Sequence, residues 1–255
     1  MNKNNIEKRV VKEFLEQKRE KPIVCVPIMG DTKEEIVGQV QECAEKGIEA
    51  IEWRLDAFEG LESPNAIREV LRDIEPFMEN IMFIYTLRTK PQGGMVELTD
   101  DQIKEIHSVA TEFSIVDFID VECFSVENVK KEIDFLRKKN KKVIISHHEF
   151  NETPNIDILE NIFIEMFSLK ADAVKIAVMP LNAEDVLKIF ELTYRVKSKY
   201  PNIPLITISM GKLGVISRIA GGVFGSSLTF GTVRKESAPG QIEVEKLEKI
   251  MNVIY

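Results

Sequence analysis

The sequence contains few cysteines, no excess of basic residues and no long hydrophobic run. Its three cysteines, Cys25, Cys43 and Cys123, show no paired spacing, so we expect reduced packing residues rather than disulfides. The net charge of −8 argues against nucleic acid or an anionic membrane as the main partner, because both attract clustered Lys and Arg. No stretch has the length of a transmembrane helix or the apolar centre of a signal peptide. These absences favour a cytoplasmic enzyme that acts on a small molecule.

The sequence instead contains short β-branched segments that alternate with longer amphipathic ones. Such alternation indicates a parallel sheet covered by helices. Eight pairs within 255 residues favour an α/β fold of the (β/α)8 TIM barrel type, and an open doubly wound sheet is the alternative. The expected strands cover residues 23–29, 50–56, 82–88, 118–122, 143–148, 173–179, 205–210 and 227–230. The expected helices cover residues 32–46, 64–78, 99–112, 126–139, 156–169, 183–199, 215–221 and 244–253.

The start of the chain differs from the rest, because it is highly charged and lacks the strand pattern. Its apolar residues fall at helical spacing, at Ile6, Val10, Val11, Phe14 and Leu15. We expect residues 1–22 to form an extra N-terminal helix that packs on the barrel, for example across its N-terminal face. Residues 23–255 contain no Pro-, Ser- or Gly-rich linker, so we expect them to form a single catalytic barrel domain.

Lys175 lies inside the apolar run at residues 173–179. A buried ammonium group is costly unless it is paired, neutralised or used in chemistry. Burial disfavours the charged form of a lysine, and a neutral lysine is a nucleophile toward ketones and aldehydes. Schiff-base chemistry is therefore the first hypothesis. The alternative is a lysine at a strand end whose ammonium group reaches water or a carboxylate.

Polar residues also occur at the C-terminal ends of the other expected strands, which is where the active sites of such barrels lie. Side chains alternate along a strand, so Glu52, Arg54 and Asp56 share one face, while the apolar residues between them face the helices. Each of these residues alone could belong to a structural ion pair or a helix cap. Together with Lys175 they predict one site. The same alternation adds to this face Arg88, Asp120, Glu122 and His148.

Five motifs occur in order along the chain: Glu52-Trp53-Arg54, residues 146–150 followed by Thr153-Pro154, residues 175–180, residues 214–218 and residues 237–241. Together they resemble type I 3-dehydroquinate dehydratase, from about residue 23 to the C-terminus. The resemblance implies a cytoplasmic barrel enzyme, usually a homodimer, that needs no metal or cofactor. Its substrate would be 3-dehydroquinate, which this hydro-lyase converts to 3-dehydroshikimate in the third step of the shikimate pathway.

The resemblance also assigns roles to residues of this chain. Lys175 and His148 would be catalytic: Lys175 would form an imine with the C3 ketone, and His148 would remove the C2 proton and assist departure of the C1 hydroxyl. The substrate carboxylate would be held by Arg218, Ser237 and Gln241. The ring hydroxyls would be bound by Glu52, Arg54 and Arg88. Auxiliary roles would fall to the apolar walls Met210 and Phe230, and to Glu122 as a group that tunes Lys175 or His148.

Two features depart from the family pattern. Gln92 stands where glutamate is usual, and an amide can orient His148 but cannot raise its basicity through charge. The N-terminal helix stands where the family commonly has a short β-hairpin under the barrel. Two other functions stay open: a class I aldolase, which has no clear phosphate site in its favour, and a catalytically idle relative that binds a shikimate-type ligand.

Overall fold

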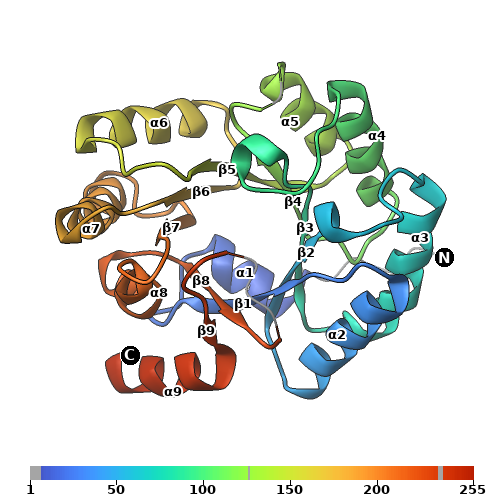
Figure 1. Cartoon of the computed structure of the whole chain (residues 1–255), viewed down its shortest axis with the longest axis horizontal. Helices are drawn as coiled ribbons and strands as arrows, with labels where there is room; N and C mark the ends of the chain where they lie inside the picture. Colours follow the sequence, from blue (N-terminus) through green and yellow to red (C-terminus); the bar gives the residue numbers. More distant parts are fainter. Residues whose placement is uncertain (1–6, 126, 235–237) are drawn as a thin grey trace.

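The computed structural model describes residues 7–125, 127–234 and 238–255, in which parallel strands form a closed layer inside a ring of helices (Figure 1). The order of hydrogen-bonded strands is β7-β6-β5-β4-β3-β2-β1-β8-β9, and every pair is parallel. This is the barrel expected from the sequence, and the open sheet is excluded. The strands are β1 (Ile23–Ile28), β2 (Ala50–Arg54), β3 (Met82–Thr86), β4 (Phe118–Glu122), β5 (Lys142–Glu149), β6 (Ala173–Val178), β7 (Leu205–Ser209), β8 (Leu228–Thr232) and β9 (Ile242–Glu243).

A helix follows each of the eight strands of the barrel, and one helix precedes them. None of the described helices is long and apolar enough to cross a membrane. The helices are α1 (Arg9–Leu15), α2 (Lys33–Glu45), α3 (Pro64–Ile74), α4 (Asp100–Thr111), α5 (Val129–Lys138), α6 (Ile156–Ser168), α7 (Ala183–Lys199), α8 (Val215–Ala220) and α9 (Val244–Ile254). Short 3-10 helices are η1 (Leu55–Ala57), η2 (Glu75–Phe77), η3 (Lys90–Gln92) and η4 (Gly221–Phe224).

Local chemistry explains most differences from the expected boundaries. Thr32 and Thr99 are caps rather than helical residues, since each side chain accepts a hydrogen bond from the backbone N–H three residues later. The helix expected over residues 64–78 ends at Ile74 and continues as η2, because Pro76 has no N–H to donate. The two-residue strand β9 was not expected from the sequence, as it is too short to show an alternating pattern.

Alternation along the strands separates two apolar layers. One lies between the sheet and the outer helices and includes Ile51, Trp53 and Leu55. The other lies inside the barrel and includes Ala173 and Ala177, the small neighbours of Lys175. The predicted division of β2 into a polar inner face and an apolar outer face is therefore confirmed. All three cysteines are buried and unpaired, as expected.

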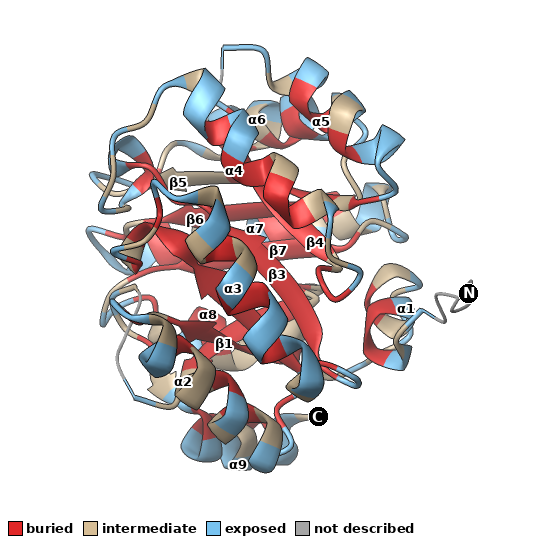
Figure 2. Cartoon of the chain, turned by 90° about the vertical axis from the view of Figure 1, so that its right-hand side faces the viewer, coloured by how far each residue is buried: buried red, intermediate tan, exposed pale blue. Residues whose placement is uncertain are grey.

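The helix α1 closes the N-terminal end of the barrel, at the right of Figure 2. Val10, Val11 and Phe14 are buried against the inner layer, and the Phe14 ring meets the edge of Phe118 with centroids 5.6 Å apart. This is the N-terminal helix expected from the sequence. Ile6, which was expected to belong to its apolar face, lies outside the described residues.

The strands β7 and β8 meet at a seam that differs from the other strand pairs. Ser227 N donates to Leu205 O at 2.8 Å, and Leu205 N donates to Ser227 Oγ at 3.3 Å. Thr207 N donates to Ser226 Oγ at 3.2 Å. Serine hydroxyls thus accept two of the hydrogen bonds that strand carbonyls accept elsewhere in the barrel.

Candidate functional site

Lys175 and Glu52 form a buried ion pair inside the C-terminal end of the barrel. Lys175 lies in β6 and Glu52 in β2, and the alternation of side chains turns both inward. Lys175 Nζ lies 2.8 Å from Glu52 Oε1 and 4.5 Å from the ring centre of Phe230. Burial alone would raise the pKa of Glu52, but the charges of Lys175, Arg54 and Arg88 lower that pKa below its usual value. The ammonium group therefore faces a fully ionised carboxylate at neutral pH.

Arg88 holds a second group of charges beside this pair. Its Nη2 donates to Asp120 Oδ1 at 2.9 Å, and its Nη1 donates to Glu122 Oε1 at 3.1 Å and to Ser146 Oγ at 2.9 Å. Asp120 Oδ2 lies 3.9 Å from Lys175 Nζ, so the two groups of charges touch. Charges from neighbouring strands are therefore joined in one network.

Glu122 serves Arg88 more directly than it serves the lysine or the histidine. Besides Arg88, it accepts hydrogen bonds from Thr89 N at 2.8 Å and from Thr89 Oγ1 at 2.6 Å. Its hydrogen bonds among the described residues thus go to Arg88 and Thr89, whereas the sequence suggested that it tunes Lys175 or His148. Arg88 and Asp120 are the hydrogen-bonded connection between Glu122 and Lys175.

The guanidinium of Arg54 is held by Asp56 in a bidentate pair. Arg54 Nε donates to Asp56 Oδ1 and Arg54 Nη2 donates to Asp56 Oδ2, both at 2.8 Å. The expected strand over residues 50–56 ends at Arg54, and Asp56 lies in the 3-10 turn η1. That turn keeps Asp56 buried beside Arg54, so the two residues stay together although the strand is shorter than expected.

His148, at the end of β5, lines the cavity that these charged residues surround. Its backbone N donates to Gln92 Oε1 at 2.6 Å, and its ring stacks on Phe150 with centroids 6.2 Å apart. Burial and the charges of Arg88 and Lys175 lower the pKa of His148 well below its usual value, so the imidazole is neutral at neutral pH. Gln92 therefore contacts the backbone of His148, where the sequence predicted an orienting contact without naming the atom.

The neighbouring His147 lies on the other face of β5, because side chains alternate along a strand. Its ring meets the edge of Phe124, with centroids 5.0 Å apart and planes at 89°. Burial lowers its pKa as well. His147 does not line the cavity described below, and we regard it as a packing residue.

The remaining expected site residues come from the elements after β7 and β8. Arg218 in α8 is 2% exposed, and its Nη2 donates to Pro239 O at 3.0 Å. Gln241 follows Pro239 by two residues and lines the same cavity, as do Met210 and Phe230. Ser237, expected beside Gln241, lies outside the described residues.

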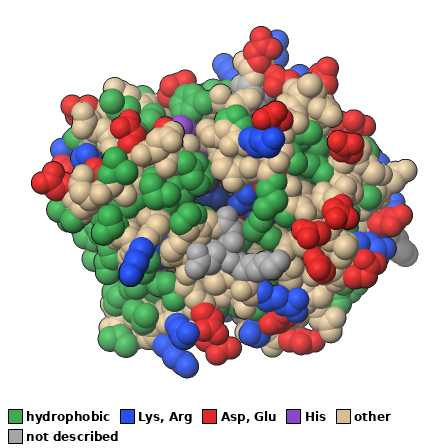
Figure 3. Space-filling model, viewed as in Figure 1, with side chains coloured by type: hydrophobic (Ala, Val, Ile, Leu, Met, Phe, Trp, Pro, Cys, Tyr) green, Lys and Arg blue, Asp and Glu red, His purple; other side chains and the backbone are tan. Residues whose placement is uncertain are grey.

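These side chains surround a cavity of about 40 Å³ at the C-terminal end of the barrel. Figure 3 shows a hollow at the centre of this face, with Lys or Arg atoms inside it. Among the described residues, no group of three or more His, Cys, Asp or Glu side chains is arranged to hold a metal ion. The lining residues are Glu52, Arg54, Arg88, Gln92, Gly93, His148, Phe150, Lys175, Ala177, Ile208, Met210, Arg218, Phe230, Ala238 and Gln241.

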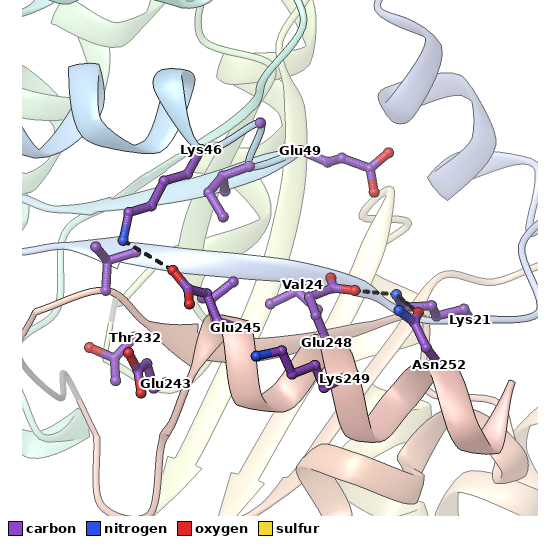
Figure 4. A pocket seen from close by; sticks show the side chains of 14 residues that line it. Lys21, Val24, Lys46, Glu49, Thr232, Glu243, Glu245, Glu248, Lys249 and Asn252 are labelled. Atoms are coloured by element: carbon purple, nitrogen blue, oxygen red, sulfur yellow. Dashed lines mark hydrogen bonds and ion pairs between the residues drawn. The ribbon is translucent and has the colours of Figure 1, made fainter.

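A wider groove of about 520 Å³ lies between β1 and the C-terminal helix α9 (Figure 4). Lys21 forms an ion pair with Glu248 and donates to Asn252 Oδ1 at 2.8 Å. Lys46 Nζ lies 3.7 Å from Glu245 Oε1. These charges are partly exposed and already compensated by α9. We therefore place the candidate site in the smaller cavity, where buried charges from several strands converge.

Thr86, Gly93 and Phe150 are among the residues of the site that had no assigned role in the sequence. Thr86 Oγ1 donates to Glu52 Oε1 at 3.0 Å, and Thr86 shares its strand face with Arg88, so alternation alone could have identified it. Gly93 and Phe150 line the cavity and contact each other, although they are far apart in the sequence. No local pattern could have revealed that contact.

Comparisons with known proteins identify the family of this chain. The family model for type I 3-dehydroquinase matches residues 24–255. The 3-dehydroquinate dehydratase of Clostridioides difficile (strain 630) is 39% identical over 236 residues, which is 92% of each chain. The crystal structure of type I 3-dehydroquinate dehydratase from Clostridium difficile with covalently modified comenic acid has a TM-score of 0.87, again at 39% identity and covering 92% of both chains.

A more distant relative has a similar fold. The 3-dehydroquinate dehydratase structure from Geobacillus kaustophilus is 27% identical, covers 92% of this chain and 91% of its own, and also has a TM-score of 0.87. The matched region contains β1 to α9 and therefore all the residues around the cavity. The chain belongs to the type I 3-dehydroquinate dehydratase family and is a lyase of the shikimate pathway.

Proposed function

We propose that this enzyme dehydrates 3-dehydroquinate to 3-dehydroshikimate through a Schiff base on Lys175. The observation that carries the proposal is the position of Lys175 Nζ in the cavity, 2.8 Å from the carboxylate of Glu52, with a neutral His148 from the adjacent strand lining the same cavity. The crystal structure of the related Clostridium difficile protein contains covalently modified comenic acid, which supports covalent chemistry by an enzyme of this family.

The first step is addition of the Lys175 amine to the C3 ketone of the substrate. The ammonium group must first lose a proton, and Glu52 Oε1 is the acceptor at hydrogen-bond distance. The amine then forms a carbon–nitrogen bond, and the ketone oxygen leaves as water. The resulting protonated imine withdraws electrons from C2 and makes its proton more acidic.

The second step uses His148 as base and then as acid. Its imidazole is neutral at neutral pH, so it can accept the C2 proton as the enamine forms. The enamine electrons then expel the C1 hydroxyl, which takes the proton from His148 and leaves as water. Water finally hydrolyses the imine, which releases 3-dehydroshikimate and restores Lys175.

The remaining site residues would bind and orient the substrate. Arg218 and Gln241, together with Ser237, would hold the C1 carboxylate, because a buried guanidinium is a strong partner for a carboxylate. The ring hydroxyls would be bound by Glu52, Arg54 and Arg88. Apolar contact with the ring would come from Met210 and Phe230, while Gln92 and Glu122 would act indirectly by holding His148 and Arg88.

The cavity must widen before this substrate can enter. Its volume of about 40 Å³ is far below the several hundred Å³ that is typical of ligand pockets. Pro239 O accepts hydrogen bonds from Gly211 N and from Arg218 Nη2, both at 3.0 Å, so residues 238–241 cover the cavity as a hydrogen-bonded segment. We expect this segment to move outward for binding and to close again over the carboxylate.

We further propose a cytoplasmic homodimer in which residues 23–255 form the catalytic domain. Apolar side chains gather on the left of Figure 3, over α6 to α8. Leu187 and Tyr194 of α7 are each 64% exposed, and a large exposed apolar patch is typical of a subunit interface. Sedimentation of the parent protein and of Leu187→Glu tests the dimer: the parent should sediment as a dimer and the variant as a monomer.

Borohydride trapping tests the proposed reaction. The enzyme would be mixed with 3-dehydroquinate, reduced, and studied by intact-protein and peptide mass spectrometry. We expect one reduced ligand adduct on Lys175, and Lys197, a partly buried lysine at the other end of the barrel, should remain unmodified. A folded protein that forms no adduct while it turns over 3-dehydroquinate would refute the Schiff base. No turnover at all would direct attention to aldol substrates.

A further inference from the structure

The His148 ring lacks the hydrogen bond that usually orients a catalytic imidazole. In such sites, one ring nitrogen exchanges the proton and the other is fixed by a hydrogen bond to a third group. His148 Nδ1 is buried and has no hydrogen-bond partner among the described residues. Gln92 is beside it but accepts from the backbone N–H of His148 instead. The orientation of the ring must therefore come from packing.

Phe150 supplies that packing. Its ring lies nearly parallel to the His148 ring, with planes at 16° and centroids 6.2 Å apart. This separation is within the range of offset-stacked aromatic pairs. Phe150 follows His148 by two residues, so both side chains leave the chain on the same side. Both also line the cavity.

Gly93 in turn fixes the position of Phe150. Its φ of +82° lies in the left-handed region, and a Cβ built there would lie 2.1 Å from Phe150 Cζ and 2.3 Å from Phe150 Cε2. No side chain can therefore occupy position 93 unless the Phe150 ring moves. The ring is confined between the Gly93 backbone on one side and the His148 imidazole on another.

The same turn also holds the backbone of His148. The paired register of β4 and β5 ends at Glu122 and Ser146, so β5 continues past the last residue of β4. The N–H of His148 in this overhang would lack a partner, and Gln92 Oε1 accepts it at 2.6 Å. The adjacent residues Gln92 and Gly93 thus fix the backbone and, through Phe150, the ring of His148.

We propose that Phe150 is a positioning residue for His148, held in place by the turn at Gln92 and Gly93. The inference rests on the proposed function, in which His148 moves the C2 proton. Positioning by an aromatic ring orients the base without placing a negative charge beside it. Orientation and basicity of His148 are then controlled separately, by Phe150 and by the surrounding charges.

Phe150→Leu tests this proposal, because it keeps an apolar side chain but removes the flat ring. A small displacement of a catalytic group can cost about 100-fold in rate. We expect kcat to fall about 10- to 100-fold while KM changes little, since Lys175 and Arg218 are untouched. Imine formation should continue, so borohydride should trap a larger steady-state fraction of enzyme than in the parent. Phe150→Tyr should restore kcat.

Two further variants complete the design. Phe124→Leu is the matched control, because Phe124 packs against His147 outside the cavity, and it should keep the kcat of the parent. Gly93→Ala displaces the Phe150 ring without changing Phe150 itself, and it should reproduce the loss of kcat and the trapped imine. It also provides the test if Phe150→Leu does not fold.

The outcomes separate the two proposals. If the parent turns over 3-dehydroquinate and Phe150→Leu keeps its kcat, the positioning role is wrong and the proposed function stands. A rise in KM at unchanged kcat would identify Phe150 as a substrate wall and would also overturn the inference. Lack of turnover by the parent protein overturns the proposed function and this inference together.

Discussion

The two ends of the barrel both hold cationic side chains away from water, but they arrange the partners differently. At the C-terminal end, Lys175 and Arg88 pair with several carboxylates that project from other strands into one cavity. At the N-terminal end, Lys141 and Lys197 donate to backbone carbonyls of nearby loops, with distances of 2.9 Å to Val116 O and 2.8 Å to Ile203 O. Backbone carbonyls can hold an ammonium group by hydrogen bonds, but they do not take its proton. Proton transfer needs an ionisable partner such as a carboxylate.

This comparison shows that a shifted pKa is not by itself a sign of function. Burial lowers the pKa of Lys141 and of Lys197 to about 8, although both lie at the end of the barrel that is away from the cavity. Structural sites perturb ionisable groups as strongly as active sites do. Partner type alone does not separate the ends either, because Lys8 at the N-terminal end pairs with Asp117 Oδ2 at 2.6 Å. The C-terminal end is distinguished by several carboxylates and cations that converge around one cavity.

The largest expected effect comes from removing Lys175, and Lys197 at the other end of the barrel provides the comparison. Lys175→Ala should lower turnover of 3-dehydroquinate by at least about 10⁴-fold, because the nucleophile is lost. Lys197→Ala should lower the melting temperature but keep kcat, because its partners are two backbone carbonyls and the Gln17 amide oxygen, all away from the cavity. Steady-state kinetics give kcat for both variants, and thermal unfolding followed by circular dichroism gives their melting temperatures. Equal losses of kcat would remove the distinction between the two ends.

The next effect in size concerns the proton transfer. His148→Ala should lower kcat by about 10³-fold, the contribution of a well-placed general base. The imine on Lys175 should still form and accumulate, as measured by borohydride trapping and mass spectrometry. His147→Ala is the control on the opposite face of β5 and should keep kcat. If no imine is trapped in His148→Ala, the histidine is needed for imine formation rather than for the later proton transfer.

A smaller effect is expected for carboxylate binding. Arg218→Ala should raise KM about 10- to 100-fold, since a hydrogen bond to a charged group contributes about 1.5–3 kcal/mol. The value of kcat should change less. Arg19→Ala, which removes a half-exposed arginine from the other end of the barrel, should leave KM unchanged. An unchanged KM in Arg218→Ala would mean that other groups hold the carboxylate.

The pH dependence of the rate should show how the surrounding charges shift the pKa of His148. The base must be neutral, and its lowered pKa in the free enzyme means that kcat/KM should show no fall due to His148 until well below pH 6.5. Gln92→Glu adds a negative charge nearby, which favours imidazolium, raises the pKa of His148 and moves this fall to higher pH. The measurement is kcat/KM against pH for both proteins. Coincident profiles would show that position 92 does not act electrostatically on the imidazole.

The smallest effect on rate is expected at the N-terminal end. Phe14→Ala removes a buried ring that contacts Phe118, and it should lower the free energy of unfolding by about 3–5 kcal/mol. The kcat of the folded variant should equal that of the parent. Denaturant unfolding and kinetics on the same sample test this. A loss of kcat without a loss of stability would mean that α1 acts on the active site.

Much of the barrel and its site could be predicted because the necessary information is local. Alternation along β2 placed Glu52 and Arg54 inside and Trp53 outside, and the same argument placed Lys175 between two small alanines. Parallel strands that end at one edge then bring these side chains together whatever the details of the loops. The helix α7 was also predicted with its correct boundaries, since Asn182 caps it and no proline interrupts it.

The contacts that could not be predicted join distant parts of the chain. The preference of Glu122 for Thr89 depends on the exact position of the turn after β3, which alternation does not determine. The packing of Phe150 on Gly93 depends on how far β5 extends beyond β4. Both are properties of three-dimensional packing, and no periodicity in the sequence encodes them.

The seam between β7 and β8 indicates where the barrel can deform most easily. The other junctions are ladders of paired strands, whereas the described residues of this one are joined by the backbone bond from Ser227 to Leu205 and by the hydroxyls of Ser226 and Ser227. The strands on either side of it carry Ile208 and Phe230, two walls of the cavity. We therefore expect the barrel to be most compliant on the side that has to expand when a six-membered ring enters.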